Sequence, residues 1–401
     1  MIGAGQAAIQ CAETLRKKGF KGRIDLVGDE PHLPYQRPPL SKKYLAGELG
    51  LDRLTLRHQH YFDEQDIRLH LGRRAVSIER SKSEVRLDDG NALAYDALVL
   101  ATGSVPRRLT LPGGDLAGVH YLKDVAEADR LRSEIQAGRR AVIIGGGYIG
   151  LETAATLRHL GMEVTVLEMA GRVMSRVVAE TVSRYYEAEH AGHGVQIRLR
   201  CGVTALLGDG SGRIRAVETS AGTLEAHLVI VGIGVLANDA LAQTAGLACE
   251  NGILVDEYCR TSDAAIYAIG DCSNHPSLRY GRRIRLESVD NAFEQGSTAA
   301  LNILGQTQAH DRVPWFWSDQ YHHKLLIVGL SQGHDHVVLR GRPEDNAFSC
   351  CYLKSDGELL AIDTVNLAKD QMAARKLIAA RAKLDLKKAA DIAIPLKDCI
   401  Q

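Results

Sequence analysis

Three closely spaced glycines in the middle of the chain give the clearest indication of chemistry. Gly145, Gly147 and Gly150 have the spacing G-x-G-x-x-G, between the apolar run 141–144 and a predicted helix. Glycines at this spacing let the backbone turn sharply, approach a pyrophosphate and pack a helix against a sheet, while the unpaired N–H groups at the start of the helix attract the anion. This segment is therefore predicted to bind a dinucleotide.

An acidic residue indicates which dinucleotide this turn would bind. Glu168 ends the second strand of the predicted strand–helix–strand segment, eighteen residues after Gly150. A carboxylate there can accept hydrogen bonds from a ribose 2′-hydroxyl and would repel a 2′-phosphate. The sequence therefore favours NAD over NADP. Both strands, the helix and the acid together make the pattern far more specific than the glycines alone.

A second motif of the same kind stands at the beginning of the chain. Gly3, Gly5 and Ala8 have the spacing G-x-G-x-x-A, and Asp29 and Glu30 follow the next apolar run as candidate ribose acceptors. Almost no strand precedes these glycines, although a first strand of two residues could hardly fill the centre of a parallel sheet. We therefore expect several native residues to precede the first residue of this sequence.

The elements that must position these motifs fit a large globular protein. A chain of 401 residues should divide into roughly three domains. No apolar run approaches the roughly 20 residues of a membrane span, and no secretion signal is recognisable, so a cytoplasmic location is expected. The formal net charge of zero argues against general nucleic-acid binding. Eight scattered cysteines without C-x-x-C spacing indicate free thiols and no metal site.

Two further strands end in residues that can contact a ligand. The apolar runs before Thr102–Gly103 and before Asp271 are predicted to be buried strands, and ligands bind at the carboxyl ends of strands in open α/β sheets. Asp271 is equally suited to cap the next element or to accept from ligand hydroxyls. Lys42 follows a proline-rich loop, and it fits a ligand contact or a solvated surface lysine equally well.

The last part of the chain changes character. Residues 314–366 alternate apolar and polar side chains between Gly, Asp and Asn turns, which predicts an antiparallel meander. A basic helix is expected at about 367–384. Trp315 and Trp317 stand two apart on the first strand and therefore share one face. Core packing is the more common role of such a pair, and lining a flat ligand is the alternative.

Two dinucleotide motifs in one chain suggest a bound flavin and a hydride donor. In addition, five stretches resemble the FAD-dependent NADH:ferredoxin reductases of oxygenase systems, a family of flavoproteins with two dinucleotide-binding domains. These stretches are GAG at the start, ATG at 101–103, GGGYIGLE at 145–152, TSDAAIYAIGDC at 261–272 and WFWSDQY at 315–321. The similarity extends over nearly the whole chain, including its last domain.

The resemblance implies an α/β fold with two Rossmann-like dinucleotide-binding domains and a small C-terminal α+β interface domain. The FAD domain would consist of residues 1–108 and 234–312, the NAD domain of residues 109–233 and the interface domain of residues 313–401. The cofactors would be FAD and NADH.

The resemblance also assigns site residues. Lys42 and Glu152 would form a catalytic charged pair at the flavin ring. Contacts to FAD would come from Gly3, Gly5, Ala7, Asp29, Glu30, Lys42, Val76, Ala101, Thr102, Gly103, Arg132, Asp271, Val289 and Trp317. The NADH site would consist of Gly145, Gly147, Ile149, Gly150, Glu168 and Gly234.

The implied activity is electron transfer from NADH through FAD to a [2Fe–2S] ferredoxin that feeds a mono- or dioxygenase. A rubredoxin reductase and a non-catalytic flavoprotein similar to apoptosis-inducing factor are the alternatives. Thiol-based relatives are disfavoured because they need a cysteine pair, or a single cysteine where this chain has Ser41-Lys42. Basic residues offer a docking patch for an acidic ferredoxin, although a solvated charge run explains each of them equally well. They are Arg279, Arg282, Arg283, Arg285 and Lys397.

Overall fold

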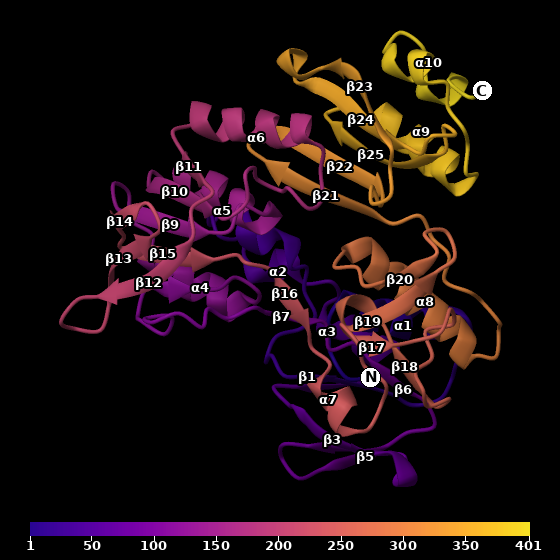
Figure 1. Ribbon diagram of the computed structural model, residues 1–401. Helices are drawn as coiled ribbons and strands as arrows, with labels where there is room; N and C mark the ends of the chain where they lie inside the picture. Colours follow the sequence, from indigo (N-terminus) through magenta and orange to yellow (C-terminus); the bar gives the residue numbers. More distant parts are fainter. The chain divides into compact units, whose positions relative to one another are not determined.

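The computed structural model describes all residues 1–401, which divide into two compact units of non-contiguous segments (Figure 1). The first unit consists of residues 1–36, 51–105 and 235–312, and the second of 37–50, 106–234 and 313–401. Residues 37–50, which contain Lys42, belong to the second unit, although the predicted domain 1–108 includes them. The division into four domain segments remains a prediction.

A parallel sheet forms the centre of the first unit. Strand β1 (Ile24–Gly28) pairs with β2 (Ile67–Leu71), and β6 (Leu98–Leu100) pairs with β18 (Ile266–Ala268). Ile2 joins the two pairs, because it forms parallel bridges to both Val27 and Leu100. Its N–H donates to the Val99 carbonyl at 2.8 Å, and its own carbonyl accepts from Ala101 at 2.7 Å. On the β1 side the Gly3 N–H donates to the Val27 carbonyl at 2.8 Å, so the first residues have strand hydrogen bonds on both sides.

Two helices pack together against this sheet. Helix α1 (Gln6–Lys17) follows the first glycine turn, and α8 (Val289–Ile303) begins where Ser288 accepts a hydrogen bond from the Asn291 N–H. Small residues allow the two helices to approach closely, since a Cβ at Gly296 would come within 2.6 Å of the Ala7 carbonyl oxygen.

The remaining elements of the first unit surround this core. They are α2 (Leu51–Leu54), α3 (Gln59–Glu64), β3 (Ala75–Glu79), β4 (Glu84–Leu87), β5 (Ala92–Ala94), β7 (Ser104–Pro106), β16 (Val235–Ala237), α7 (Ala240–Thr244), β17 (Ile253–Leu254), β19 (Ser273–Ser277) and β20 (Arg282–Ile284). Strands β3, β4 and β5 form an antiparallel layer, and Asp89 and Gly90 lie in the turn between its last two strands.

The second unit contains a five-stranded parallel sheet with the order β11-β10-β9-β15-β8. The strands are β8 (Val119–His120), β9 (Arg140–Ile144), β10 (Glu163–Glu168), β11 (Gln196–Leu199) and β15 (Leu228–Val231), and the helices are α4 (Val125–Glu134), α5 (Tyr148–His159) and α6 (Glu180–Gly192). A small antiparallel layer follows, with β12 (Val203–Gly208), β13 (Ile214–Thr219) and β14 (Gly222–Glu225).

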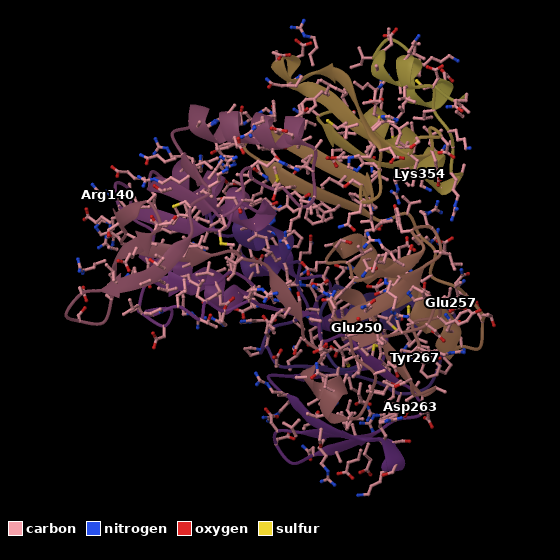
Figure 2. The ribbon with its side chains drawn as sticks, in the orientation of Figure 1. Arg140, Glu250, Glu257, Asp263, Tyr267 and Lys354 are labelled. Carbon is pink, nitrogen blue, oxygen red and sulfur yellow. The ribbon has the colours of Figure 1, made fainter.

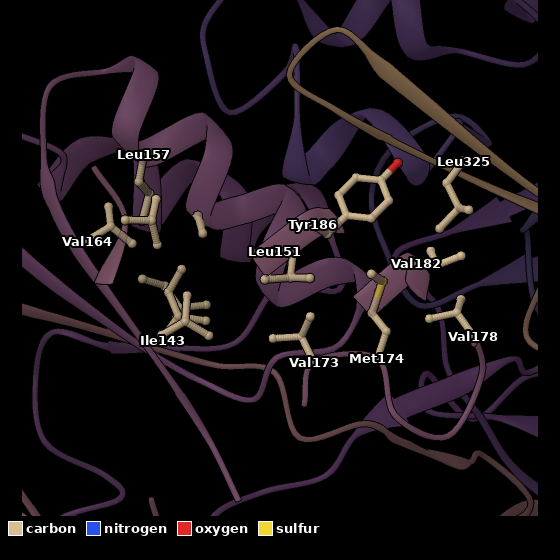
Figure 3. Close-up of a cluster of buried hydrophobic side chains, with 14 of the residues drawn as sticks. Ile143, Leu151, Leu157, Val164, Val173, Met174, Val178, Val182, Tyr186 and Leu325 are labelled. Atoms are coloured by element: carbon tan, nitrogen blue, oxygen red, sulfur yellow. The ribbon is translucent and has the colours of Figure 1, made fainter. Parts of the chain in front are cut away.

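Apolar side chains of β9, α5 and α6 form the core of this unit. Ile143, Leu151 and Tyr186 are fully buried within it, and Leu325 joins them from the C-terminal sheet (Figure 3). Outside this core, Arg140 (Figure 2) lies at the exposed start of β9 and pairs with Glu163 at 3.2 Å. The shared core joins the parallel sheet and the C-terminal sheet within the second unit.

The C-terminal sheet has five antiparallel strands in the order β21-β22-β25-β24-β23. They are β21 (Trp315–Gln320), β22 (His323–Gly329), β23 (His336–Arg342), β24 (Ala347–Leu353) and β25 (Leu359–Val365), followed by α9 (Ala368–Ala379) and α10 (Leu386–Ala390). The antiparallel strands are confirmed, but the simple meander is wrong. Every residue of β25 is buried, and this strand takes the centre of the sheet between β22 and β24. None of the helices combines the length and the apolar character that crossing a bilayer requires.

Candidate functional site

The glycine turn of the second unit has the backbone geometry that a dinucleotide requires. Gly145 has φ +108°, and a Cβ there would lie 2.3 Å from the Gly232 carbonyl oxygen. A Cβ at Gly150 would lie 2.2 Å from the Gly145 carbonyl oxygen. Gly147 precedes α5 and is different, because no atom lies within 4 Å of a Cβ placed there. Two glycines thus permit close packing, whereas the third leaves the start of α5 open.

Glu168 lies directly against this turn. Its Oε2 accepts from the Gly146 N–H at 2.8 Å, and its Oε1 accepts from the Ala170 N–H at 2.7 Å. These hydrogen bonds fix the carboxylate at the carboxyl end of β10, next to the glycines. Ile149 is 47% exposed at the start of α5, and Gly234 has φ +96° with open space beside it. The residues present therefore fit a dinucleotide at this edge of the sheet.

The structure brings Lys42 and Glu152 together as an ion pair within the second unit. The Lys42 Nζ lies 2.7 Å from Glu152 Oε2, and the Glu152 side chain is 5% exposed. The Ser41 hydroxyl donates to the same oxygen at 2.6 Å, and the Ser318 hydroxyl donates to Oε1 at 2.7 Å. Lys42 is therefore not a solvated surface lysine: it has a buried partner 110 residues away in the sequence.

Local sequence explains how Lys42 is presented. Pro38 and Pro39 begin a short 3₁₀ turn that ends at Ser41, immediately before Lys42. The Lys42 N–H donates to the Pro39 carbonyl at 3.0 Å, and the Ser41 carbonyl accepts from the Thr156 hydroxyl of α5 at 2.8 Å. Both ends of this segment are thus attached, which limits the positions that the lysine side chain can reach.

The glycine turn of the first unit repeats the arrangement of the second. Gly3 has φ +104°, and a Cβ there would lie 2.1 Å from the Ala101 carbonyl oxygen. Gly5 precedes α1 with no atom within 4 Å of its Cβ position, and Ala7 lies buried in the first turn of α1. The turn therefore leaves the start of α1 open to a ligand, as a pyrophosphate of FAD would require.

The strand ends of the first unit meet at the same side of its sheet. Thr102 donates to the Asn238 carbonyl at 2.5 Å, and Gly103 has φ +69° with open space beside it. Asp271 follows β18 and accepts a hydrogen bond from the Ser104 hydroxyl at 2.8 Å. Because the carboxyl ends of parallel strands lie at one edge, these residues and Gly3 are suited to one extended ligand.

The other predicted flavin contacts are scattered over both units, and their roles remain predictions. The two candidate ribose acids differ: Asp29 is exposed, whereas Glu30 accepts a hydrogen bond from the Tyr35 hydroxyl. Val76 is 52% exposed on β3, and Val289 is the first residue of α8. Arg132 lies on α4 beside Gly47. Trp317 lies on β21, with its ring centroid 5.4 Å from that of Trp315.

The structure weakens part of the predicted docking patch. Arg283 donates to the carbonyls of Val255 and Asn274, and Arg285 is only 10% exposed in its side chain and pairs with Glu287 at 2.7 Å. Both guanidinium groups hold the backbone or a neighbouring side chain of the first unit. Arg282, Arg283 and Lys397 are exposed, and Arg279 is half-buried.

Thiol chemistry does not fit the described site. All eight cysteines are free, and Ser41 occupies the position next to Lys42. Cys11, in α1, is fully buried, and burial raises the pKa of its thiol to about 12. A thiol with this pKa stays protonated at neutral pH and is a poor nucleophile.

Comparison with known proteins identifies the family. The family profile described as pyridine nucleotide-disulphide oxidoreductase matches residues 1–296. The chain belongs to this family. A second profile, described as reductase C-terminal, matches residues 315–400. These matches confirm the α/β class and the separate C-terminal region expected from the sequence.

Several family members resemble this chain over almost its whole length. Rhodocoxin reductase of Rhodococcus erythropolis is 44% identical, covering 99% of this chain and 93% of its own. The ferredoxin–NAD(+) reductase component of the anthranilate 1,2-dioxygenase system of Burkholderia cepacia is also 44% identical, over 99% of this chain and 98% of its own. The reductase in the crystal structure of the covalent putidaredoxin reductase–putidaredoxin complex matches with a TM-score of 0.96 at 41% identity, over 99% and 96% of the two chains. The resemblance inferred from the sequence motifs is thus confirmed.

Sequence reasoning missed two donors to Glu152. Ser41 and Ser318 lie 111 and 166 residues from it in the sequence. Ser41 stands beside Lys42, so its neighbourhood was recognisable. Ser318 lies in the WFWSDQY motif, but nothing in the spacing of that motif indicates that its serine reaches α5.

Proposed function

We propose that this chain is the reductase of an oxygenase system, which takes electrons from NADH and passes them to a [2Fe–2S] ferredoxin. Two features carry the proposal: the two open glycine turns in one chain, and the ion pair between Lys42 and the buried Glu152. Ser41-Lys42 stands where thiol enzymes hold a cysteine. Relatives named as ferredoxin reductases, and a relative solved in complex with putidaredoxin, support this assignment.

The cofactors are FAD and NADH. FAD, when bound, accepts an electron pair as hydride and releases the electrons singly, which the protein side chains cannot do. Residues of the first unit would hold it: N–H groups at the start of α1 for the pyrophosphate, and Asp271 as an acceptor for hydroxyls. One NADH supplies two electrons, each of two ferredoxins takes one, and one proton is released.

The second unit would bind NADH and supply the charged groups. The open start of α5 favours the pyrophosphate, and Glu168 would accept from the adenosine ribose. We propose that Lys42 stabilises the negative charge that develops during reduction. Its ammonium is already held in place by Glu152, so little reorganisation is needed when that charge appears.

The purified yellow protein, incubated with NADH and a panel of [2Fe–2S] ferredoxins and rubredoxins, tests this function. We expect NADH to bleach the flavin and cytochrome c reduction to depend on an added ferredoxin. Slow NADH oxidation without any gain from ferredoxin would instead support a non-catalytic flavoprotein. Faster reduction of a rubredoxin than of every ferredoxin would support a rubredoxin reductase.

The same assay tests electrostatic docking. We propose that exposed basic residues, Arg282 and Lys397 among them, attract an acidic ferredoxin. Cytochrome c reduction through ferredoxin should then fall as the salt concentration rises, because salt screens exposed charges, while ferricyanide reduction should stay constant. An equal salt response of both reactions would rule out this docking mode.

A substitution at Glu168 tests the preference for NADH. Glu168→Ala should raise the Michaelis constant for NADH about tenfold, the effect of losing one hydrogen bond to a charged group. The difference between the Michaelis constants for NADH and NADPH should therefore become smaller. Glu163→Ala, an exposed acid at the start of the same strand, is the control that should change neither value. An unchanged NADH:NADPH ratio in Glu168→Ala would remove the proposed role.

A further inference from the structure

A continuous chain of hydrogen bonds runs from Glu152 through the second unit. The Ser318 hydroxyl donates to Glu152 Oε1 at 2.7 Å, and the Gln320 Nε2 donates to the Ser318 hydroxyl at 3.1 Å. On the far side of the amide, His190 Nε2 lies 2.9 Å from Gln320 Oε1. The Tyr321 hydroxyl lies 3.1 Å from His190 Nδ1. Three elements, α5, β21 and α6, are joined in this way.

The members of this chain are removed from solvent. Ser318 and His190 are 0% exposed, Gln320 is 1% exposed and Glu152 is 5% exposed. Ser318 and Gln320 stand two apart on β21 and therefore project from the same face of the strand. A buried polar group without a partner costs about 1–3 kcal/mol, so each hydrogen bond constrains its neighbours strongly.

All donors in the chain point toward Glu152. Burial lowers the pKa of His190 to about 4, so its imidazole is neutral at physiological pH. The neutral ring donates from Nε2 to the Gln320 oxygen and accepts the Tyr321 hydroxyl proton at Nδ1. Because the four hydrogen bonds are aligned, each polarises the next and strengthens the last one, which reaches the carboxylate.

This chain of hydrogen bonds can orient the Glu152 carboxylate but cannot conduct protons. A proton passing Gln320 would have to convert its amide into an imidic acid, which is a high-energy form. Glu152 also receives the Lys42 ammonium and the Ser41 hydroxyl on its other oxygen. The two sets of donors hold the carboxylate from opposite sides and thereby fix the position of the lysine.

The outer end of the chain shows backbone strain. Tyr321 has φ +53°, a left-handed conformation that costs a non-glycine residue about 1–3 kcal/mol when the surrounding structure imposes it. It begins the two-residue turn between β21 and β22. Its hydroxyl reaches His190, and its ring stacks on His193 with the centroids 3.8 Å apart. This strained tyrosine is the last member of the hydrogen-bond chain.

We propose that Ser318, Gln320 and His190 are positioning residues that fix Glu152, and through it Lys42, for the reduction by NADH. The C-terminal sheet would then contribute to the first half of the reaction as well as carrying a partner surface. This inference rests on the proposed function. The alternative is that the chain only fastens β21 to α5 and α6.

The test measures flavin bleaching by NADH in the FAD-loaded protein without ferredoxin, at increasing NADH concentrations. Ser318→Ala should lower the limiting rate about tenfold, the effect of losing one hydrogen bond to a charged group, with the NADH dissociation constant unchanged. Gln320→Met has a similar length but no N–H that can donate to Ser318, so it should lower the rate similarly. The flavin midpoint potential should also change in both variants.

Ser349→Ala is the matched control. Ser349 is equally buried in the same sheet and also donates to a carboxylate, that of Asp370 at 3.0 Å, but it is not part of the chain. It should lower the melting temperature as much as Ser318→Ala does and leave the rate and potential unchanged. In a Glu152→Ala background, Ser318→Ala should have no further effect on the rate.

Three outcomes would overturn the proposal or its basis. Equal rates and potentials in Ser318→Ala and Ser349→Ala would show a merely structural role, as would additive effects of Ser318→Ala and Glu152→Ala. In either case normal bleaching of the unsubstituted protein and its ferredoxin reduction would leave the proposed function intact. If NADH does not bleach the unsubstituted protein, the proposed function and this inference both fail.

Discussion

Lys42→Met is expected to lower the limiting rate of flavin reduction by NADH about a hundredfold, the size of effect that follows removal of a preorganised charge. Methionine keeps most of the length of the side chain but removes the ammonium that pairs with Glu152 at 2.7 Å. The carboxylate then keeps only its two serine donors, Ser41 and Ser318. Stopped-flow absorbance with NADH in excess measures the limiting rate.

Lys43→Met provides the control for this substitution. Lys43 is the next residue in the chain and is exposed, so its loss should leave the rate unchanged. The melting temperature of Lys42→Met should fall as well, because Glu152 remains buried without its cation. A rate within a factor of about two of the unsubstituted protein, too small for the loss of such a charge, would contradict the assignment of Lys42 as a catalytic residue.

Gly147→Ala is expected to weaken NADH binding about a hundredfold while the protein folds normally. No atom lies within 4 Å of a Cβ at this position, and its φ of −82° suits alanine. The methyl group would instead occupy the space in front of α5 that a pyrophosphate must enter. Losing one or two hydrogen bonds to the charged phosphates, each about 1.5–3 kcal/mol, accounts for the size of the effect. Equilibrium titration with NADH measures the dissociation constant.

Gly145→Ala is the comparison that distinguishes a loss of binding from a loss of stability. Its φ is +108°, and the new Cβ would lie 2.3 Å from a backbone carbonyl that cannot move aside easily. Strain and overpacking together should reduce the free energy of unfolding by about 3 kcal/mol or more. Unfolding by urea measures this loss. If Gly147→Ala instead destabilised the protein as much as Gly145→Ala does, Gly147 would be required for packing and not for binding the dinucleotide.

Short-range patterns in the sequence predicted the elements correctly where local chemistry decides them. The glycine spacing at 145–150 requires a strand, a turn and a helix, and β9 and α5 are observed there. The alternation after residue 315 likewise indicated antiparallel strands. It could not give their order, because the central position of β25 depends on which strand is most completely buried.

The pairing of the two residues before Gly3 also could not be predicted from local sequence patterns. Ile2 bridges β1 and β6 on its two sides, and the neighbouring strands supply its hydrogen-bond partners. Such pairing depends on chain segments about 25 and 100 residues away, which no local pattern describes. That native residues precede this sequence stays a prediction.

The sequence alone determined the two dinucleotide turns, the acid Glu168 and the family, because each depends on residue types at fixed short spacings. The family resemblance already implied the Lys42–Glu152 pair, whereas only the tertiary structure decided that residues 37–50 belong with the second unit and that Ser41 and Ser318 donate to the buried Glu152. The physical reason is that a buried carboxylate collects donors from wherever the fold brings them. In this protein the donors come from positions 41, 42 and 318, and the spacing of these residues along the sequence does not show that they lie close together.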